Sequence, residues 1–213
     1  MRMRDTRRQR WGVAVSDKVD GPYTFAKHFR TLGQESRDIG QFVDDDGANY
    51  LIFESRPTKG FYIARLKDDG MDVTETAFVK APLEGGALVR YEGLYYVIGS
   101  HMTGWKPNPN VYATAKALQG PWSEFKELAP GSADTWGSQS SMLVKVTGSK
   151  RNGSKTTGSN TTVIYVGDVW KPKELWDSRY VWMPVEVGGG AMRLPRPEVW
   201  GVDVGTGVAT VAK

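Results

Sequence analysis

The sequence predicts an all-β domain of the β-propeller type, because short strand patterns and turn signals recur along it at a spacing near half a hundred residues. Residues 14–23 begin with Ala-Val-Ser and end with Gly-Pro-Tyr, and residues 113–122, 99 positions later, begin with Ala-Thr-Ala and end with Gly-Pro-Trp. Between them, two strand-like runs that each follow a glycine turn contain Tyr50 and Tyr96, 46 positions apart. In a propeller, residues from distant repeats meet around one central funnel.

The composition agrees with this fold class. A chain of 213 residues is long enough for one sizeable core. Its 25 Gly and 11 Pro suit many tight turns, and its 8 Trp and 9 Tyr suit strands. The chain contains no Cys, which excludes disulfide and thiolate chemistry. No apolar run approaches the ~20 residues that a membrane-spanning helix needs.

The net charge of +4 comes from the first ten residues, which hold five arginines and one aspartate. Basic and acidic side chains are equal in number over the rest of the chain, so the charge pattern does not indicate a nucleic-acid partner. A basic segment at 1–10 could bind an acidic polymer, but a solvated stretch is the simpler interpretation. No apolar signal-peptide core follows Met1.

Apolar runs bounded by turn residues divide the chain into four units. The units cover 11–34, 36–80, 81–128 and a stretch that begins near 134. Within the last three units, strands are expected at 41–43, 50–53 and 61–66, at 87–89, 94–98 and 110–114, and at 141–146, 163–166 and 180–185. Residues 191–213 are rich in Gly and Val and predict a C-terminal strand or tail.

A polar stretch interrupts the fourth unit. Residues 147–161 are almost entirely Gly, Ser, Thr, Lys, Arg and Asn, so they have little apolar area to bury and predict a mobile hairpin loop. Two N-glycosylation sequons begin at Asn152 and Asn160. Two sequons in one loop of a chain without Cys favour a secreted protein.

The residues just before the first strand of each blade crowd the central funnel of a propeller. Asp38 opens the second unit, Glu84 the third, and Gln139 lies near the start of the fourth. Paired carboxylates in a funnel suit cleavage of a glycosidic bond, because one must stay protonated to donate to the leaving oxygen and a nearby negative charge raises its pKa. Aromatic side chains that could stack on a sugar ring are Trp105, Trp136, Trp170 and Tyr112.

Structural roles compete with these interpretations. From spacing alone, Asp38 is more often a turn residue that bonds its own backbone, and a loop carboxylate such as Glu84 is usually solvated. The acidic run at 44–46 resembles a metal site, but consecutive carboxylates point in different directions, so a turn is expected. His28 and His101 are isolated histidines, for which structural roles are expected.

Several motifs resemble glycoside hydrolase family 43, whose members are five-bladed β-propeller glycosidases. Ser-Arg-Asp-Ile-Gly at 36–40 and Asp-Asp-Asp-Gly-Ala-Asn-Tyr-Leu at 44–51 are similar to the blade that carries the family's second carboxylate. The segment 84–100 is similar to its general-acid segment. Motifs similar to the exo-β-1,3-galactanase branch stand at 101–108, 112–113, 120–122, 135–139, 167–170 and 177–184. The resemblance covers roughly residues 11–186.

The resemblance implies a role for each matching residue. Glu84 is expected to be the general acid, and Asp38 is expected to orient the substrate and hold up the pKa of Glu84. Gln139 is expected to hold or activate the attacking water, in place of the aspartate base that is usual in the family. The residues expected at the sugar pocket are Thr103, Gly104 and Trp105, together with Trp136.

The expected function is a hydrolase that releases galactose from the non-reducing end of β-1,3-galactan, such as the backbone of arabinogalactan, with inversion at the anomeric carbon. An arabinofuranosidase or xylosidase of the same family, and a non-catalytic carbohydrate-binding propeller, are the alternatives. No cofactor and no metal ligands are expected, although calcium in the channel is possible. The expected partner is a polysaccharide, rather than a nucleic acid or a membrane.

About four of the family's five blades can be counted in this chain. The expected organisation is a basic segment at 1–10, an incomplete propeller domain at 11–190 whose first blade is missing, and the strand or tail at 191–213. The full-length protein is expected to be secreted. Exposed blade flanks are expected to make this chain, expressed alone, poorly soluble or oligomeric and essentially inactive.

Overall fold

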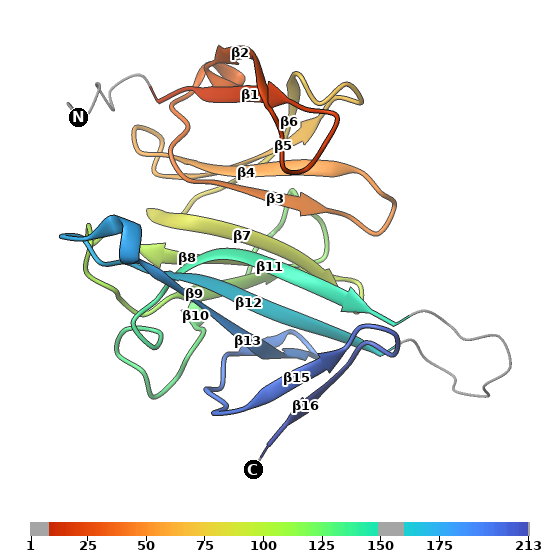
Figure 1. Ribbon diagram of the computed structural model, residues 1–213, viewed down its shortest axis with the longest axis vertical. Helices are drawn as coiled ribbons and strands as arrows, with labels where there is room; N and C mark the ends of the chain where they lie inside the picture. Colours follow the sequence, from red (N-terminus) through yellow and green to blue (C-terminus); the bar gives the residue numbers. More distant parts are fainter. Residues whose placement is uncertain (1–8, 149–159, 213) are drawn as a thin grey trace, which may run out of the picture.

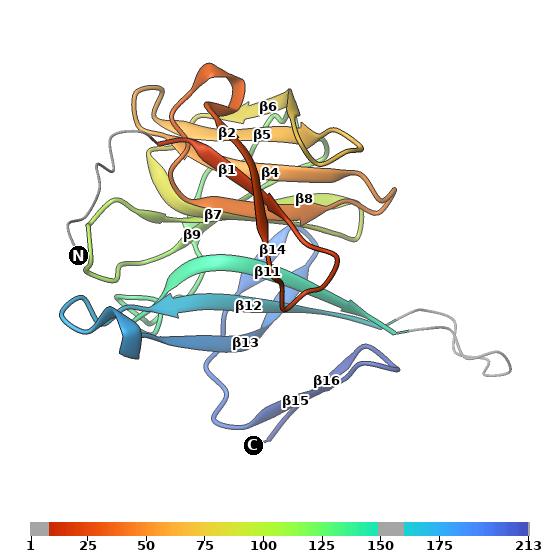
Figure 2. The same cartoon turned by 45° about the horizontal axis from the view of Figure 1, so that its top comes forward.

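The apolar runs and turn signals of the sequence fold into antiparallel strands, which confirms the all-β, propeller-type class. The computed structural model describes residues 9–148 and 160–212. It contains three four-stranded sheets and two hairpins, which follow one another in chain order (Figures 1 and 2). In the part of the chain that is described, no helix has the length and apolar character needed to cross a membrane.

Each sheet is built from a continuous stretch of the chain. The first hairpin joins β1 (Trp11–Val15) and β2 (Thr24–Phe29), and it is followed by the 3-10 turn η2 (Thr31–Gly33). The first sheet contains β3 (Ile39–Val43), β4 (Asn49–Ser55), β5 (Gly60–Leu66) and β6 (Val73–Val79). The second sheet contains β7 (Leu83–Tyr91), β8 (Leu94–His101), β9 (Val111–Ala115) and β10 (Lys126–Glu127). The third contains β11 (Gln139–Thr147), β12 (Thr161–Val169), β13 (Arg179–Gly188) and β14 (Ala191–Arg193), with the 3-10 turn η3 (Leu175–Asp177) before β13. The last hairpin joins β15 (Trp200–Asp203) and β16 (Val208–Val211).

The predicted units correspond to these elements with one difference in size. The second, third and fourth units each form one four-stranded blade, whereas the first unit, 11–34, forms only a two-stranded hairpin and η2. Residues 191–213 hold β14 and the hairpin β15–β16. The predicted loop at 147–161, with the sequon at Asn152, lies mostly outside the described residues; Asn160, the start of the second sequon, is exposed.

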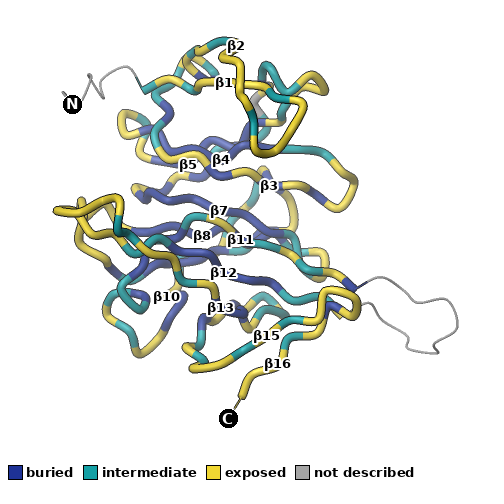
Figure 3. Tube along the Cα trace, viewed as in Figure 1, coloured by how far each residue is buried: buried dark blue, intermediate teal, exposed yellow. Residues whose placement is uncertain are grey.

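The first and second sheets each contribute to two hydrophobic cores, because successive side chains of a strand point to opposite faces. In β4, Ile52 belongs to the core between the first and second sheets, while its neighbour Phe53 packs on the side of the first hairpin. In β8, Val97 joins the first of these cores, and Tyr96 joins the core between the second and third sheets. The buried strands therefore run through the middle of the molecule in Figure 3.

The first strands of the three sheets approach until their backbones touch. A Cβ atom on Gly40 of β3 would lie 2.5 Å from the carbonyl oxygen of Gly86 in β7. On the other side of β7, a Cβ on Gly85 would lie 2.6 Å from the carbonyl oxygen of Ser140 in β11, and Gly85 also has a φ of +62°. The register of β7 shifts at this point, which marks a β-bulge. Glycine is therefore required where these inner strands converge.

The far ends of the same strands are joined by charge pairs. Asp45, in the turn after β3, pairs with Arg90 of β7 and with Lys145 of β11. The neighbouring Asp44 accepts hydrogen bonds from the hydroxyl of Tyr95 (2.7 Å) and from Arg90 (3.4 Å). The backbone N–H of Gly47 donates to the carbonyl of Asp44 (2.9 Å), which confirms that the acidic run at 44–46 is a turn. The starts of β3, β7 and β11 lie next to one another, and so do their ends. The three strands therefore run in the same direction, and the residues that begin them are brought together.

We predict that Gly40→Ala destabilises the fold, because its new methyl group would collide with backbone rather than with a side chain that can rotate away. The free energy of unfolding should fall by about 1–3 kcal/mol, the usual cost of overpacking a core. Gly12→Ala is the matched control, since a Cβ on Gly12 of β1 would meet nothing within 4 Å. Denaturant midpoints of the two variants would be compared with that of the wild type. Equal midpoints for the two variants would contradict the proposed close approach of β3 and β7.

Candidate active site

The three residues expected at the funnel are brought together by the inner strands. Asp38 lies directly before β3, Glu84 is the second residue of β7, and Gln139 is the first residue of β11. The side-chain amide of Gln139 donates a hydrogen bond to Glu84 Oε1 (3.2 Å). The backbone N–H of Gly85 donates to Asp38 Oδ2 (3.2 Å), which ties Asp38 to the strand that carries Glu84.

Glu84 is held on both of its carboxylate oxygens. Oε1 accepts the hydrogen bond from Gln139, and Oε2 accepts one from the guanidinium of Arg56 (3.3 Å). The residue is only 7% exposed. Burial and the nearby charge of Asp38 raise the pKa of Glu84, while Arg56 and the hydrogen bond from Gln139 act in the opposite direction. The net effect is a raised pKa, so Glu84 keeps its proton to higher pH than an ordinary glutamate.

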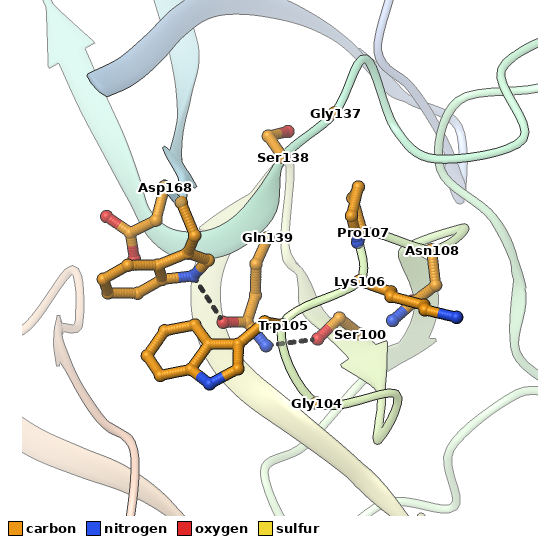
Figure 4. Close-up of a pocket in the computed structure, with 11 residues that line it drawn as sticks. Ser100, Gly104, Trp105, Lys106, Pro107, Asn108, Gly137, Ser138, Gln139 and Asp168 are labelled. Atoms are coloured by element: carbon orange, nitrogen blue, oxygen red, sulfur yellow. Dashed lines mark hydrogen bonds between the residues drawn. The ribbon is translucent and has the colours of Figure 1, made fainter. Parts of the chain in front are cut away.

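The amide of Gln139 is bonded at each of its polar atoms. Its nitrogen donates to Glu84 Oε1 and to the hydroxyl of Ser100 (2.9 Å), and its oxygen accepts the indole N–H of Trp170 (3.2 Å). Figure 4 shows the last two bonds on either side of the amide. This orientation of the amide is therefore fixed by three different residues.

A second buried carboxyl group, Glu54 at the end of β4, adjoins the pair. Its Oε2 accepts the backbone N–H of Asp38 (3.1 Å). One carboxylate oxygen from each of Glu54, Asp38 and Glu84 can be chosen so that all three lie within 4.8 Å of one another. The pKa of Glu54 is raised to about 8, mainly because the group is buried and secondly because the charge of Asp38 lies nearby.

A pocket opens beside Gln139, and the empty space within it, including open solvent at its mouth, is about 370 Å³. Its lining residues are Ser100, Gly104, Trp105, Lys106, Pro107, Asn108, Gly137, Ser138, Gln139, Asp168 and Trp170 (Figure 4). The rings of Trp105 and Trp170 meet edge to face with their centroids 5.4 Å apart. Asp168 is the one carboxylate in this lining, and burial followed by the charge of Asp38 raises its pKa.

Gly104 and Trp105 thus lie where the sequence places them, whereas Thr103 shapes the loop that carries them. The Thr103 hydroxyl donates to the carbonyl of Lys106 (2.6 Å) and accepts from the side-chain amide of Asn108 (2.7 Å). Thr103 is not among the residues that line the pocket. Its contacts instead close the turn that presents the Trp105 ring.

Trp136 does not join the pocket. Its ring packs on the core between the second and third sheets, and its indole N–H donates to the carbonyl of Leu194 (3.4 Å). The guanidinium of Arg196 lies over the ring, 5.7 Å from its centroid. Trp136 therefore has a packing position in this structure, because the chain turns inward at residues 135–137 before β11 begins.

Four further residues of the site were not singled out from the sequence: Glu54, Arg56, Ser100 and Asp168. The sequence contains a signal for Glu54, because it lies near the end of an apolar strand that is expected to be buried. A glutamate is almost never fully buried without a partner, so this position indicates a paired acidic residue. Asp168 is the register partner of Gln139 across β11 and β12, a relation that becomes visible only when the strands are aligned. The two histidines stand apart: His28 contacts Arg10, and His101 is bonded through its backbone to Asn108.

The acidic cluster does not fit a calcium ion, which takes six to eight oxygen ligands. Within it, Glu84 is bonded to Arg56 and Gln139, and Asp38 accepts the N–H of Gly85. Four of the six carboxylate oxygens of the cluster already accept hydrogen bonds, which leaves fewer free oxygens than a calcium ion takes.

Comparisons with known proteins give a consistent result. Residues 2–164 match the glycosyl hydrolases family 43. The chain is similar to the exo-β-1,3-galactanase of Phanerochaete chrysosporium, solved as a variant with one glutamate replaced by glutamine and bound to β-1,3-galactotriose (36% identity, TM-score 0.83, 96% of this chain and 46% of that one). It is also similar to an exo-β-1,3-galactanase from Clostridium thermocellum (28% identity, TM-score 0.85, 98% of this chain and 47% of that one).

A third similar structure is a family 43 β-1,3-galactosidase with galactodeoxynojirimycin (28% identity, TM-score 0.73, 87% of this chain and 66% of that one). The chain spans about half the length of the two galactanases. No curated protein matches it.

We predict that two substitutions move the pKa of Glu84 in opposite directions. Arg56→Leu should raise it, because the guanidinium that stabilises the ionised carboxylate is removed, and Asp38→Asn should lower it, because a repelling negative charge is removed. Carbon-13 NMR titration of labelled glutamate carboxyl groups measures both shifts, and Lys116→Leu, on the exposed surface, is the control. Shifts of the same sign in the two site variants would contradict this account of the cluster.

Proposed function

The chain belongs to glycosyl hydrolase family 43, and we propose that it carries the catalytic centre of an exo-acting β-1,3-galactanase. The observation that supports this most directly is Glu84, a buried carboxyl group with a raised pKa that stands one hydrogen bond from a tryptophan-bearing pocket. The substrate proposed is β-1,3-galactan, including the backbone of arabinogalactan, and galactose leaves from the non-reducing end. Because such polymers lie outside cells, the proposal includes a secreted protein.

Glu84 is proposed as the general acid. A glycosidic oxygen leaves readily only if it is protonated as the bond breaks, so the donor must still hold its proton at the working pH. Burial together with Asp38 favours the neutral form of Glu84. Arg56 limits the rise in pKa, so the same group can also give its proton away. Asp38 is proposed to maintain this balance and to orient the sugar, since its position is fixed by the N–H of Gly85.

Gln139 is proposed to position the attacking water. An amide is too weak a base to deprotonate water unaided, so its contribution is geometric or runs through an imidic-acid tautomer. Inverting glycosidases separate the acid from the group that activates water by about 6.5–9.5 Å. Here the Gln139 nitrogen is 3.2 Å from Glu84 Oε1, so a sugar must enter between them and replace this hydrogen bond. Trp170 would then continue to hold the amide through its oxygen.

The pocket supports a sugar ligand. Trp105 is 54% exposed and Trp170 is 39% exposed, which leaves large apolar ring faces accessible beside polar groups from Ser100 and Asp168. Sugars combine apolar ring faces with hydroxyl groups, and pockets that bind such ligands combine aromatic side chains with a few placed polar groups. The polar Lys106 and Asn108 complete the rim.

The proposal is tested with β-1,3-galactan and β-1,3-galactotriose as substrates. Release of galactose alone, observed first as the α-anomer by proton NMR, supports exo-action with inversion. Release of arabinose or xylose from the corresponding arabinosides or xylosides, without galactose release, would favour another specificity of the family. Binding of galactotriose in calorimetry without any turnover would favour the carbohydrate-binding alternative.

We predict that Glu84→Gln lowers turnover of β-1,3-galactotriose by about 10²–10⁴-fold, the range that general acid catalysis contributes. The variant keeps the shape of the side chain and its contact with Arg56 is weakened, but it has no proton to donate. Glu127→Gln, at an exposed glutamate of β10, is the control and should turn over like the wild type. Near wild-type turnover by Glu84→Gln would exclude Glu84 as the acid.

We predict that Gln139→Ala lowers kcat by about tenfold or more and leaves the denaturant midpoint close to that of the wild type. The reason is that Gln139 is only half-buried, so its loss removes bonds to Glu84 and Trp170 but little packing. Gln139→Glu should restore part of the rate with a shifted pH profile, because two carboxyl groups at this distance cannot both be ionised. A large fall in stability, with kcat unaffected, would assign Gln139 to the fold instead.

A further inference from the structure

Glu54 is a buried acid that the steps proposed above do not use. It is 1% exposed and is the penultimate residue of β4, between Phe53 and Ser55, both of which are also 1% exposed. Its Oε2 accepts the backbone N–H of Asp38, whereas its Oε1 is buried and accepts no hydrogen bond from any described residue. A buried carboxyl oxygen without a donor carries a large desolvation cost if the group is ionised. This arrangement suits a carboxylic acid better than a carboxylate.

The neighbours of Glu54 lead to the same conclusion. The charged groups that face it are Asp38 before β3, Glu84 on β7 and Arg56 in the turn after β4. Three carboxyl groups with oxygens within 4.8 Å of one another cannot all be ionised beside a single guanidinium. If Glu54 and Glu84 are neutral, the charges of Asp38 and Arg56 balance. If Glu54 were ionised as well, the cluster would hold an uncompensated negative charge in a buried place.

The three carboxyl groups differ in how far they are buried, and this difference indicates which of them holds a proton. Asp38 is exposed, Glu84 is 7% exposed, and Glu54 is 1% exposed. The raised pKa of Glu54, about 8, follows from that burial and from the charge of Asp38. Oxygens of Asp38 and Glu84 lie within 4.8 Å of a Glu54 oxygen, so a proton on Glu54 removes one negative charge from this cluster.

We propose that Glu54 is a neutral carboxylic acid in the working protein and acts as a positioning residue. It accepts the backbone N–H of Asp38 at Oε2, so that Asp38 is held beside Glu84 without a further negative charge. No bond to substrate is made or broken at Glu54. The part of this inference that concerns catalysis rests on the proposed function of Glu84; the protonation of Glu54 does not.

The protonation is tested by following stability against pH in the wild type and in Glu54→Gln, which has nearly the same shape and no titration. An acid whose pKa is raised from about 4.5 to about 8 on folding contributes stability that is present at low pH and is lost as the pH rises through this interval. Glu54→Gln removes that loss. The unfolding temperature of Glu54→Gln, relative to the wild type, should therefore rise by about 5 °C or more between pH 5 and pH 8.

The matched control is Glu124→Gln, at an exposed glutamate before β10, for which the difference from the wild type should stay constant across the same pH range. Infrared difference spectra between the wild type and Glu54→Gln at pH 6 provide a second readout. They should contain the carbonyl band of a protonated carboxylic acid. A constant temperature difference for Glu54→Gln, together with no such band, would overturn the proposal.

The positioning role is tested by pH–rate profiles on β-1,3-galactotriose. Glu54→Leu removes the acceptor for the Asp38 N–H and should lower kcat by about tenfold or more with little change in KM, and Glu54→Gln should recover most of that loss. The alkaline limb for Glu54→Gln should stay within about half a pH unit of the wild type, because one neutral group replaces another. A fall of the limb by a full unit would mean that Glu54 carries charge, and the proposal would be wrong.

The two proposals fail separately. If no form of the protein releases galactose, the proposed function fails, while the stability and infrared measurements still decide whether Glu54 is protonated. If galactose is released, but the stability difference is independent of pH and the infrared band is absent, only the proposal for Glu54 fails.

Discussion

Two backbone contacts, Gly40 against the carbonyl of Gly86 and Gly85 against that of Ser140, set how near the inner strands β3, β7 and β11 can come. A side chain on either glycine would need the space that a neighbouring backbone occupies. With glycine in place, the three strands start within hydrogen-bonding distance of one another. The side chains at their starts therefore cannot move apart. The crowding of carboxyl groups follows from this geometry.

Crowding the carboxyl groups costs free energy, and favourable interactions elsewhere in the blades offset this cost. The hydrophobic cores on both sides of β7 bury large side chains such as Phe61 and Tyr165 completely, and burial of an aromatic or aliphatic side chain is worth roughly 1.5–3 kcal/mol. At the far ends of the same strands the charges have opposite signs, as in Asp45 with Arg90 and Lys145. The exposed pairs add little, but they fix the relative height of the strands. The ion pairs at the ends of the inner strands and the side chains buried between the sheets thus hold the mutually repelling carboxyl groups together at the starts of the strands.

The fold and part of the site could be read from the sequence for identifiable reasons. Strand runs and turn signals are local, so the blades were predictable, and the position of Asp38, Glu84 and Gln139 at the starts of blades was enough to bring them together. The role of Trp136 was not predictable, because an aromatic side chain before β11 can face the pocket or the core, and three residues with positive φ at 135–137 turn it inward. Asp168 depends on the register between strands, which no local pattern specifies.

The charge of this cluster also gives a physical reason for an amide at position 139. A carboxylate there would lie at hydrogen-bonding distance from Glu84 Oε1, in a cluster that already contains Asp38 and Glu54, with Asp168 on the neighbouring strand. Another negative charge would have only Arg56 nearby to balance it, and it would force one more group to take up a proton. An amide has the same reach but donates a hydrogen bond to Glu84 instead of repelling it. The site thus keeps a polar group where water would have to be held, without adding to a repulsion that the inner strands cannot relieve by moving apart.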